Sequence, residues 1–272
     1  MAKISTENRE LFNAKIVPYK DEINSHLEKE KEVLALIEKE KNNVGYKKLF
    51  LCEDQIYIAT LWIAINNLSV EILDTKNNDA LNDARKCLYK AIIQLEEVVT
   101  AVINCPYSEI EDKVSEIENI PLEKRFYIVK KLGLAIQLLV DAFGENTKWK
   151  WSFVELRGRF CTVAKNLIPM KQACKDYFDP RSADYDNTVY YIRLVLKLLD
   201  QSATQYRDRY ELSTHRIDDM NAAINYLLAL RRLQILLSMK DEAEETKKKA
   251  LVWKEKLLFQ PFLESKFVFQ LG

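Results

Sequence analysis

Residues 46–73, YKKLFLCEDQIYIATLWIAINNLSVEIL, decide the fold. At 100° per residue the apolar side chains of this stretch fall on more than one side of a helix. They include Ile56, Tyr57, Ile58, Leu61, Trp62, Ile63 and Ile65. A helix that is apolar nearly all round needs neighbours on both sides, and this apolar run is too short for a membrane span. The stretch therefore predicts a core helix within a layered array of helices.

The segments on either side of 46–73 also show helical spacing. On the N-terminal side, Pro18 suits a first helical turn, and an amphipathic outer helix follows. Residues 42–45 end that helix, because Asn and Gly tolerate left-handed backbone angles. On the C-terminal side, Asn77 and Asn78 form a turn before a third helix that stops before Pro106.

The rest of the chain continues this pattern with five further helical segments. They are expected from Pro121 to Gly144, Trp149 to Leu167, about Ala183 to Tyr210, about Thr214 to Met239, and Glu242 to about Gln260. A weaker, acidic helix is expected at 108–119. The sequence therefore predicts an all-α, layered array of roughly eight to ten antiparallel helices, either an irregular bundle or a short helical-hairpin solenoid.

The domain organisation predicted from the sequence is one helical domain over 1–260, with a sub-boundary near 106–121. Residues 261–272 form an apolar tail that is expected to dock on the chain or a neighbouring subunit, or to bind a partner. Three Tyr-Ile pairs, beginning at Tyr57, Tyr127 and Tyr191, raise the hypothesis of a helical repeat. The segments match no tetratricopeptide, ankyrin or HEAT consensus pattern.

The charge balance argues against two classes of partner. The 41 basic and 41 acidic residues cancel, so no overall field attracts nucleic acid or anionic lipid. A basic segment, Lys148 to Lys175, keeps nucleic-acid binding as a third hypothesis. The five cysteines are odd in number and contain no C-x-x-C pair, which favours a reducing compartment. With no apolar N-terminal run and no stretch expected to span a membrane, a cytoplasmic location is predicted.

The sequence offers little that resembles a catalytic or metal site. Only His26 and His215 exist, and neither follows a Glu by three residues, as di-iron helical bundles require. Glu22 and His26 share a helix face, but on a very charged helix. Asp218 and Asp219 are better explained as first-turn acids than as a diphosphate-binding box. No catalytic residue, metal site or cofactor is therefore predicted, and the sequence leaves the question of enzymatic activity open.

Two groups of residues break the helical pattern and are the candidate binding sites. In 149–167, Trp151 lies opposite the seam that Phe153, Leu156 and Phe160 form, and Arg157 and Arg159 lie on the same segment. Arg231 lies on an apolar stripe, and Arg193 falls at a similar level if the flanking helices form an antiparallel hairpin. With Arg232, these arginines are candidate contacts for an anionic group.

The function predicted from the sequence is a non-catalytic helical scaffold that binds a protein or peptide, with Trp151, Arg157, Arg159, Arg193, Arg231 and Arg232 as contacts. The alternative is an enzyme or small-molecule receptor with an interior pocket for an anionic ligand. A homo-oligomer formed through the C-terminal tail is a further expectation. No membrane partner is expected.

Overall fold

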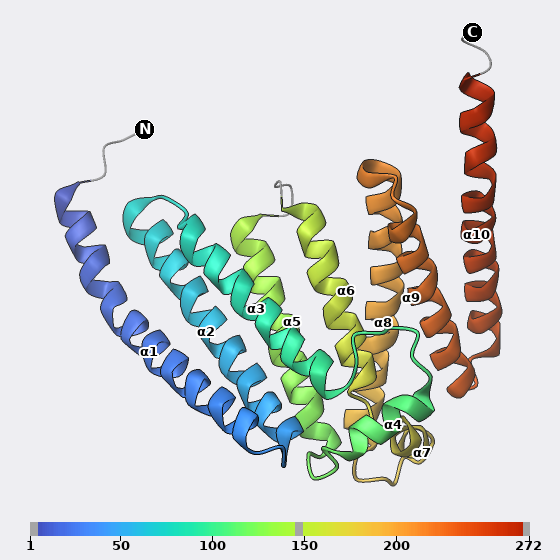
Figure 1. Cartoon of the computed structure of the whole chain (residues 1–272), viewed down its shortest axis with the longest axis horizontal. Coiled ribbons are helices and arrows are strands. Elements are labelled where there is room, and N and C mark those ends of the chain that lie inside the picture. Colours follow the sequence, from blue (N-terminus) through green and yellow to red (C-terminus); the bar gives the residue numbers. More distant parts are fainter. Residues whose placement is uncertain (1–4, 145–148, 269–272) are drawn as a thin grey trace. The chain divides into compact units, whose positions relative to one another are not determined.

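The computed structural model describes the backbone of residues 5–144 and 149–268, and the side chains of these residues up to 257. The described part contains ten α-helices, one π-helical turn and no strand (Figure 1), which confirms the all-α prediction. The elements are α1 (Thr6–Lys39), α2 (Val44–Leu73), α3 (Asn78–Val98), α4 (Tyr107–Ser115), α5 (Leu122–Phe143), α6 (Lys150–Asn166), α7 (Met170–Phe178), α8 (Tyr185–Arg209), η1 (Tyr210–Thr214), α9 (Ile217–Leu236) and α10 (Lys240–Val268).

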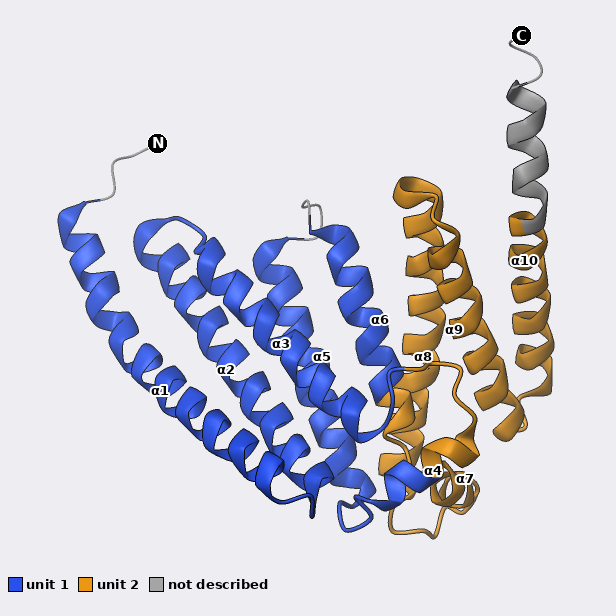
Figure 2. Cartoon of the chain, in the orientation of Figure 1, with its two compact units in different colours: residues 1–101, 112–163 blue, residues 102–111, 164–272 orange. Residues whose placement is uncertain are grey.

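The chain divides into two compact units (Figure 2). Unit 1 comprises Met1–Ala101 and Asp112–Val163, and unit 2 comprises Val102–Glu111 and Ala164–Gly272. The divisions fall shortly after α3, inside α4 and near the end of α6. A single domain with a sub-boundary near 106–121 remains a prediction. The same holds for the docked tail at 261–272, whose side chains lie outside the described residues.

Unit 1 is built around α2, which packs against α1, α3 and α5, while α3 also packs against α5. The apolar side chains of α2 that the sequence singled out are divided between these neighbours. Ile56, Ile58, Ile63 and Ile65 are buried. Because helices cover α2 on several sides, it can bury apolar residues on more than one face, although Tyr57 stays exposed.

The composition of α2 bears on the membrane question. The sequence predicted no stretch able to span a membrane. Among the described residues, however, α2 is one helix that is long and apolar enough to do so, with a mean hydropathy of 1.5 over an 18-residue window. It also buries polar side chains, namely Asp54, Gln55, Asn66 and Ser69. Buried polar groups and helical neighbours are equally typical of the core helix of a globular unit. The cytoplasmic location therefore remains a prediction.

The turn between α1 and α2 uses its residues differently from the prediction. Asn43 adopts the left-handed conformation, with φ at 55°, as expected. Gly45 instead lies within α2, where an added Cβ would stand 2.7 Å from Cγ2 of Ile117. Glycine is thus needed here for the close approach of a neighbouring segment.

The start of α1 was predicted wrongly. The helix begins at Thr6, and the Ser5 side chain caps it by accepting a hydrogen bond from the Asn8 amide at 3.1 Å. Pro18 therefore lies inside the helix and does not open it. A serine cap accepts a hydrogen bond from an N–H group that would otherwise be unpaired. This stabilises a helix start upstream of Pro18.

Unit 2 contains a hairpin of α8 and α9 joined through η1, with α10 packed on α9 and α7 on α8. The predicted cap at Ser213 or Thr214 is wrong, because α9 begins only at Ile217. The Thr214 hydroxyl instead donates to Asp219, which also accepts a hydrogen bond from Arg209. Asp219 thus holds the turn between the two helices together.

Candidate functional site

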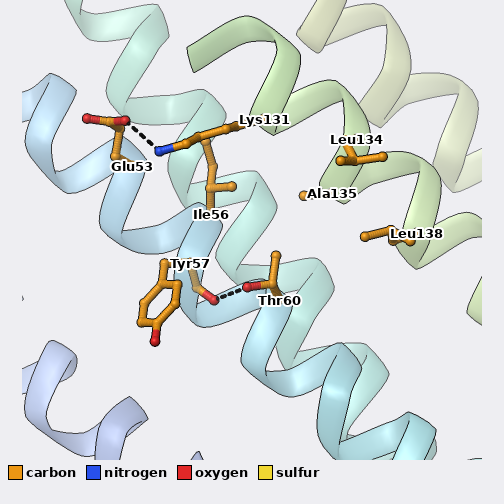
Figure 3. Close-up of a pocket in the computed structure, with 8 residues that line it drawn as sticks. All are labelled: Glu53, Ile56, Tyr57, Thr60, Lys131, Leu134, Ala135 and Leu138. Atoms are coloured by element: carbon orange, nitrogen blue, oxygen red, sulfur yellow. Dashed lines mark hydrogen bonds and ion pairs between the residues drawn. The ribbon is translucent and has the colours of Figure 1, made fainter. Parts of the chain in front are cut away.

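A hollow of about 210 Å³ lies between α2 and α5 in unit 1. Its walls come from one face of each helix (Figure 3). We call it the α2–α5 groove, lined by Glu53, Ile56, Tyr57, Thr60, Lys131, Leu134, Ala135 and Leu138. None of these residues was among the predicted contacts.

The two helices that form the groove run in the same direction. Glu53 meets Lys131 at one end, and Thr60 and Leu138 lie toward the other (Figure 3). Helical spacing explains why these residues share a face. On α2 they stand at positions 53, 56, 57 and 60, and on α5 at positions 131, 134, 135 and 138, so each lies three or four residues from another on the same helix. The groove is therefore a channel between two parallel helices, and its length exceeds one helical turn.

The groove exposes large apolar side chains. Leu134 is 63% exposed, Tyr57 43% and Leu138 42%. One turn before the Glu53–Lys131 pair on each helix, Phe50 and Tyr127 are exposed as well. Single exposed apolar residues are ordinary on protein surfaces, but a cluster around a hollow is typical of an interaction site.

An ion pair links the two walls at one end of the groove. Nζ of Lys131 lies 3.1 Å from Oε1 of Glu53, and both side chains are about 40% exposed. The same ammonium lies 4.4 Å from the centre of the Tyr127 ring. Because solvent screens an exposed pair, it contributes about 0–1 kcal/mol and opens at little cost.

A polar cluster between α1 and α2 supports the Tyr57 wall of the groove. The two ring nitrogens of His26 face carboxylates, with Nδ1 on Asp54 and Nε2 on Glu22 at 3.1 Å. The Tyr57 ring packs edge-on against His26, with 5.0 Å between the ring centres. Asp54 is buried, and its second oxygen has no hydrogen-bond partner. Glu22 and His26 share a helix face that the sequence reveals, whereas Asp54 joins them only because α2 packs on α1.

No metal site emerges from this cluster. Among the described residues, no group of three or more His, Cys, Asp or Glu side chains is arranged to hold a metal ion. The two nitrogens of His26 are instead directed at two separate carboxylates. The cluster is best explained as a link that holds α1 on α2.

The predicted contacts on α6 lie in unit 1, away from the lining of the groove. Arg159 donates two hydrogen bonds to Glu96 of α3, at 2.8 and 2.6 Å. These bonds raise the pKa of the Arg159 guanidinium. Arg157 donates to the Gln137 side chain at 3.3 Å, and Trp151 is half-buried.

The predicted arginines of unit 2 point to different elements. Arg231 lies 3.9 Å from a carboxylate oxygen of Glu244 on α10, whereas Arg232 donates to the Asn104 carbonyl at 3.1 Å. Arg193 is exposed on α8. The predicted hairpin of α8 and α9 is present, but its arginines do not share a partner.

Comparison with known proteins gives a family but no close relative. No curated protein and no solved structure matches the chain. A family model described as the TP0443 family matches residues 8–259. The family name assigns no activity. Since the match covers nearly the whole sequence, the chain belongs to the TP0443 family.

Proposed function

We propose that this protein is a non-catalytic helical scaffold that binds a protein partner by taking an amphipathic helix of that partner into the α2–α5 groove. The observation that carries the proposal is the exposure of Leu134 and Leu138 on the α5 wall of the hollow. Seating an apolar ridge there removes these side chains from water, at about 25 cal/mol for each Å² of apolar surface buried.

The shape of the groove favours a helix as the occupant. Two parallel helices leave a channel between them, and a third helix fits along it with side chains spaced at i, i+4 and i+7. On the α5 wall, Lys131, Ala135 and Leu138 lie at i, i+4 and i+7, which is the same spacing. A helix with one apolar stripe therefore meets an apolar side chain at successive turns.

The electrostatics of the groove favour a largely apolar contact. Its one lining cation, Lys131, is already paired with Glu53. A receptor for an anionic small molecule would need an unpaired, partly buried cation to balance the charge of its ligand. The alternative of such a receptor therefore has less support, and it rests on the unit 2 arginines rather than on the groove.

A helical peptide selected from a displayed library against the purified protein tests this proposal. We expect selected peptides to carry apolar residues at i, i+4 and i+7. Leu134→Glu places a charge where an apolar side chain should dock, so affinity should fall at least about tenfold. The affinity is measured by fluorescence anisotropy.

The matched control is Leu11→Glu. Leu11 is also a leucine of unit 1 on a helix, 47% exposed, and it does not line the groove. This variant should bind the peptides as the wild type does. Selected peptides that bind the Leu134→Glu protein with unchanged affinity would contradict the proposed function.

A further inference from the structure

We propose that the helix that docks in the α2–α5 groove is residues 262–271 of a second copy of the chain, so that the protein associates with itself. This inference rests on the proposed function, because it names the occupant of the same groove.

The sequence of this segment has the pattern that the groove requires. It reads FLESKFVFQL, with large apolar residues throughout and two charges. Its side chains lie outside the described residues, so the pattern is taken from the sequence. At 100° per residue, Leu263 and Phe267 form one ridge of a helix, and Glu264 and Lys266 lie on opposite flanks of that ridge.

The charges of the groove complement these flanks. Glu53 stands on the α2 wall and Lys131 on the α5 wall (Figure 3). A helix seated on its Leu263–Phe267 ridge directs Glu264 toward Lys131 and Lys266 toward Glu53 in only one of its two directions. The exposed Glu53–Lys131 pair is then exchanged for two pairs between copies, and the direction of docking is selected by charge.

Each copy has one groove and one such segment. If two copies exchange segments, both grooves are filled and the assembly closes as a symmetric dimer. A chain with a defective groove still has the segment, and a chain without the segment still has the groove. This makes a complementation experiment possible, in which two defective chains restore one contact.

Sedimentation velocity of the full-length protein and its variants tests the proposal. The wild type and Leu11→Glu should form dimers in a concentration-dependent way. Leu134→Glu, which lacks a functional groove, and a chain ending at Gln260, which lacks the segment, should each sediment as monomers. An equimolar mixture of these two should form a heterodimer, because one contributes the segment and the other the groove.

Charge reversal tests the direction of docking. Lys131→Glu should weaken the dimer about tenfold, since Glu264 then faces a like charge. Adding Glu264→Lys in the same chain should restore most of the affinity. A double variant as weak as Lys131→Glu alone would overturn the predicted pairing.

Three outcomes would overturn the inference as a whole. These are a monomeric wild type at all concentrations, a mixture that does not associate, or a chain ending at Gln260 that is thermally less stable than the monomeric Leu134→Glu protein, which would place the segment on its own chain. Selected helical peptides that still need Leu134 would show that the proposed function stands without this occupant. If those peptides bind Leu134→Glu equally well, both proposals fail.

Discussion

Two seams between helices of unit 1 differ in how they are closed. Between α3 and α6, Arg159 is fixed on Glu96 and the Tyr89 hydroxyl donates to the Ser152 carbonyl. Between α2 and α5, only the exposed Glu53–Lys131 pair crosses among the residues that line the hollow, and leucine side chains remain in water. The difference indicates that the first seam contributes to folding, whereas the second is where we propose that a partner binds.

The largest expected effect separates the buried and exposed leucines of α5. Leu132 is fully buried and Leu134 is mostly exposed. Leu132→Ala should lower the free energy of unfolding by about 3 kcal/mol, because it leaves a cavity in the core. Leu134→Ala should change it by less than about 0.5 kcal/mol. Urea denaturation measures both, and similar losses would mean that Leu134 belongs to the core.

A smaller effect is expected at the support of the groove wall. His26→Ala removes the partner of the buried Asp54 carboxylate, so stability should fall by about 2 kcal/mol. Glu22→Ala removes only the exposed carboxylate on the other side of the ring and should cost less than about 1 kcal/mol. Thermal and urea unfolding check this pair. Equal effects of the two variants would show that the Asp54 contact contributes nothing of its own.

The smallest effects compare the ion pairs of the two seams directly. Glu96→Ala should cost about 1–2 kcal/mol, because the Arg159 guanidinium, 28% exposed, loses both of its hydrogen bonds to a carboxylate. Glu53→Ala should cost less than about 1 kcal/mol, since its pair with Lys131 is more exposed. If Glu53→Ala lowers the free energy of unfolding more than Glu96→Ala does, the Glu53–Lys131 pair holds α2 and α5 together. The two seams would then not differ in the way described.

Helical periodicity predicted most of the fold. The apolar runs of α2, α5 and α8 were visible from residue types alone, and a helix apolar on several sides required a layered array. The helix boundaries were harder, since they depend on local competition. Ser5 extended α1 upstream of Pro18, and the Asp219 network delayed the start of α9 to Ile217.

The candidate site could not be predicted in the same way. Leu132 and Leu134 are the same residue type in one apolar helix, and only the neighbouring helices decide which is buried. Asp54 meets His26 because α2 packs on α1, a contact 28 residues apart in sequence. Conversely, Arg159 was a candidate contact near Trp151, but it pairs with Glu96 within the chain.

The most direct test of an open groove is leucine-methyl NMR during titration with a selected helical peptide. If the peptide binds in the groove, the methyl signals of Leu134 and Leu138 should shift, while that of Leu156, buried on α6, should not. Shifts at Leu156 with none at Leu134 or Leu138 would contradict binding in the groove, because the peptide would then bind elsewhere in the protein.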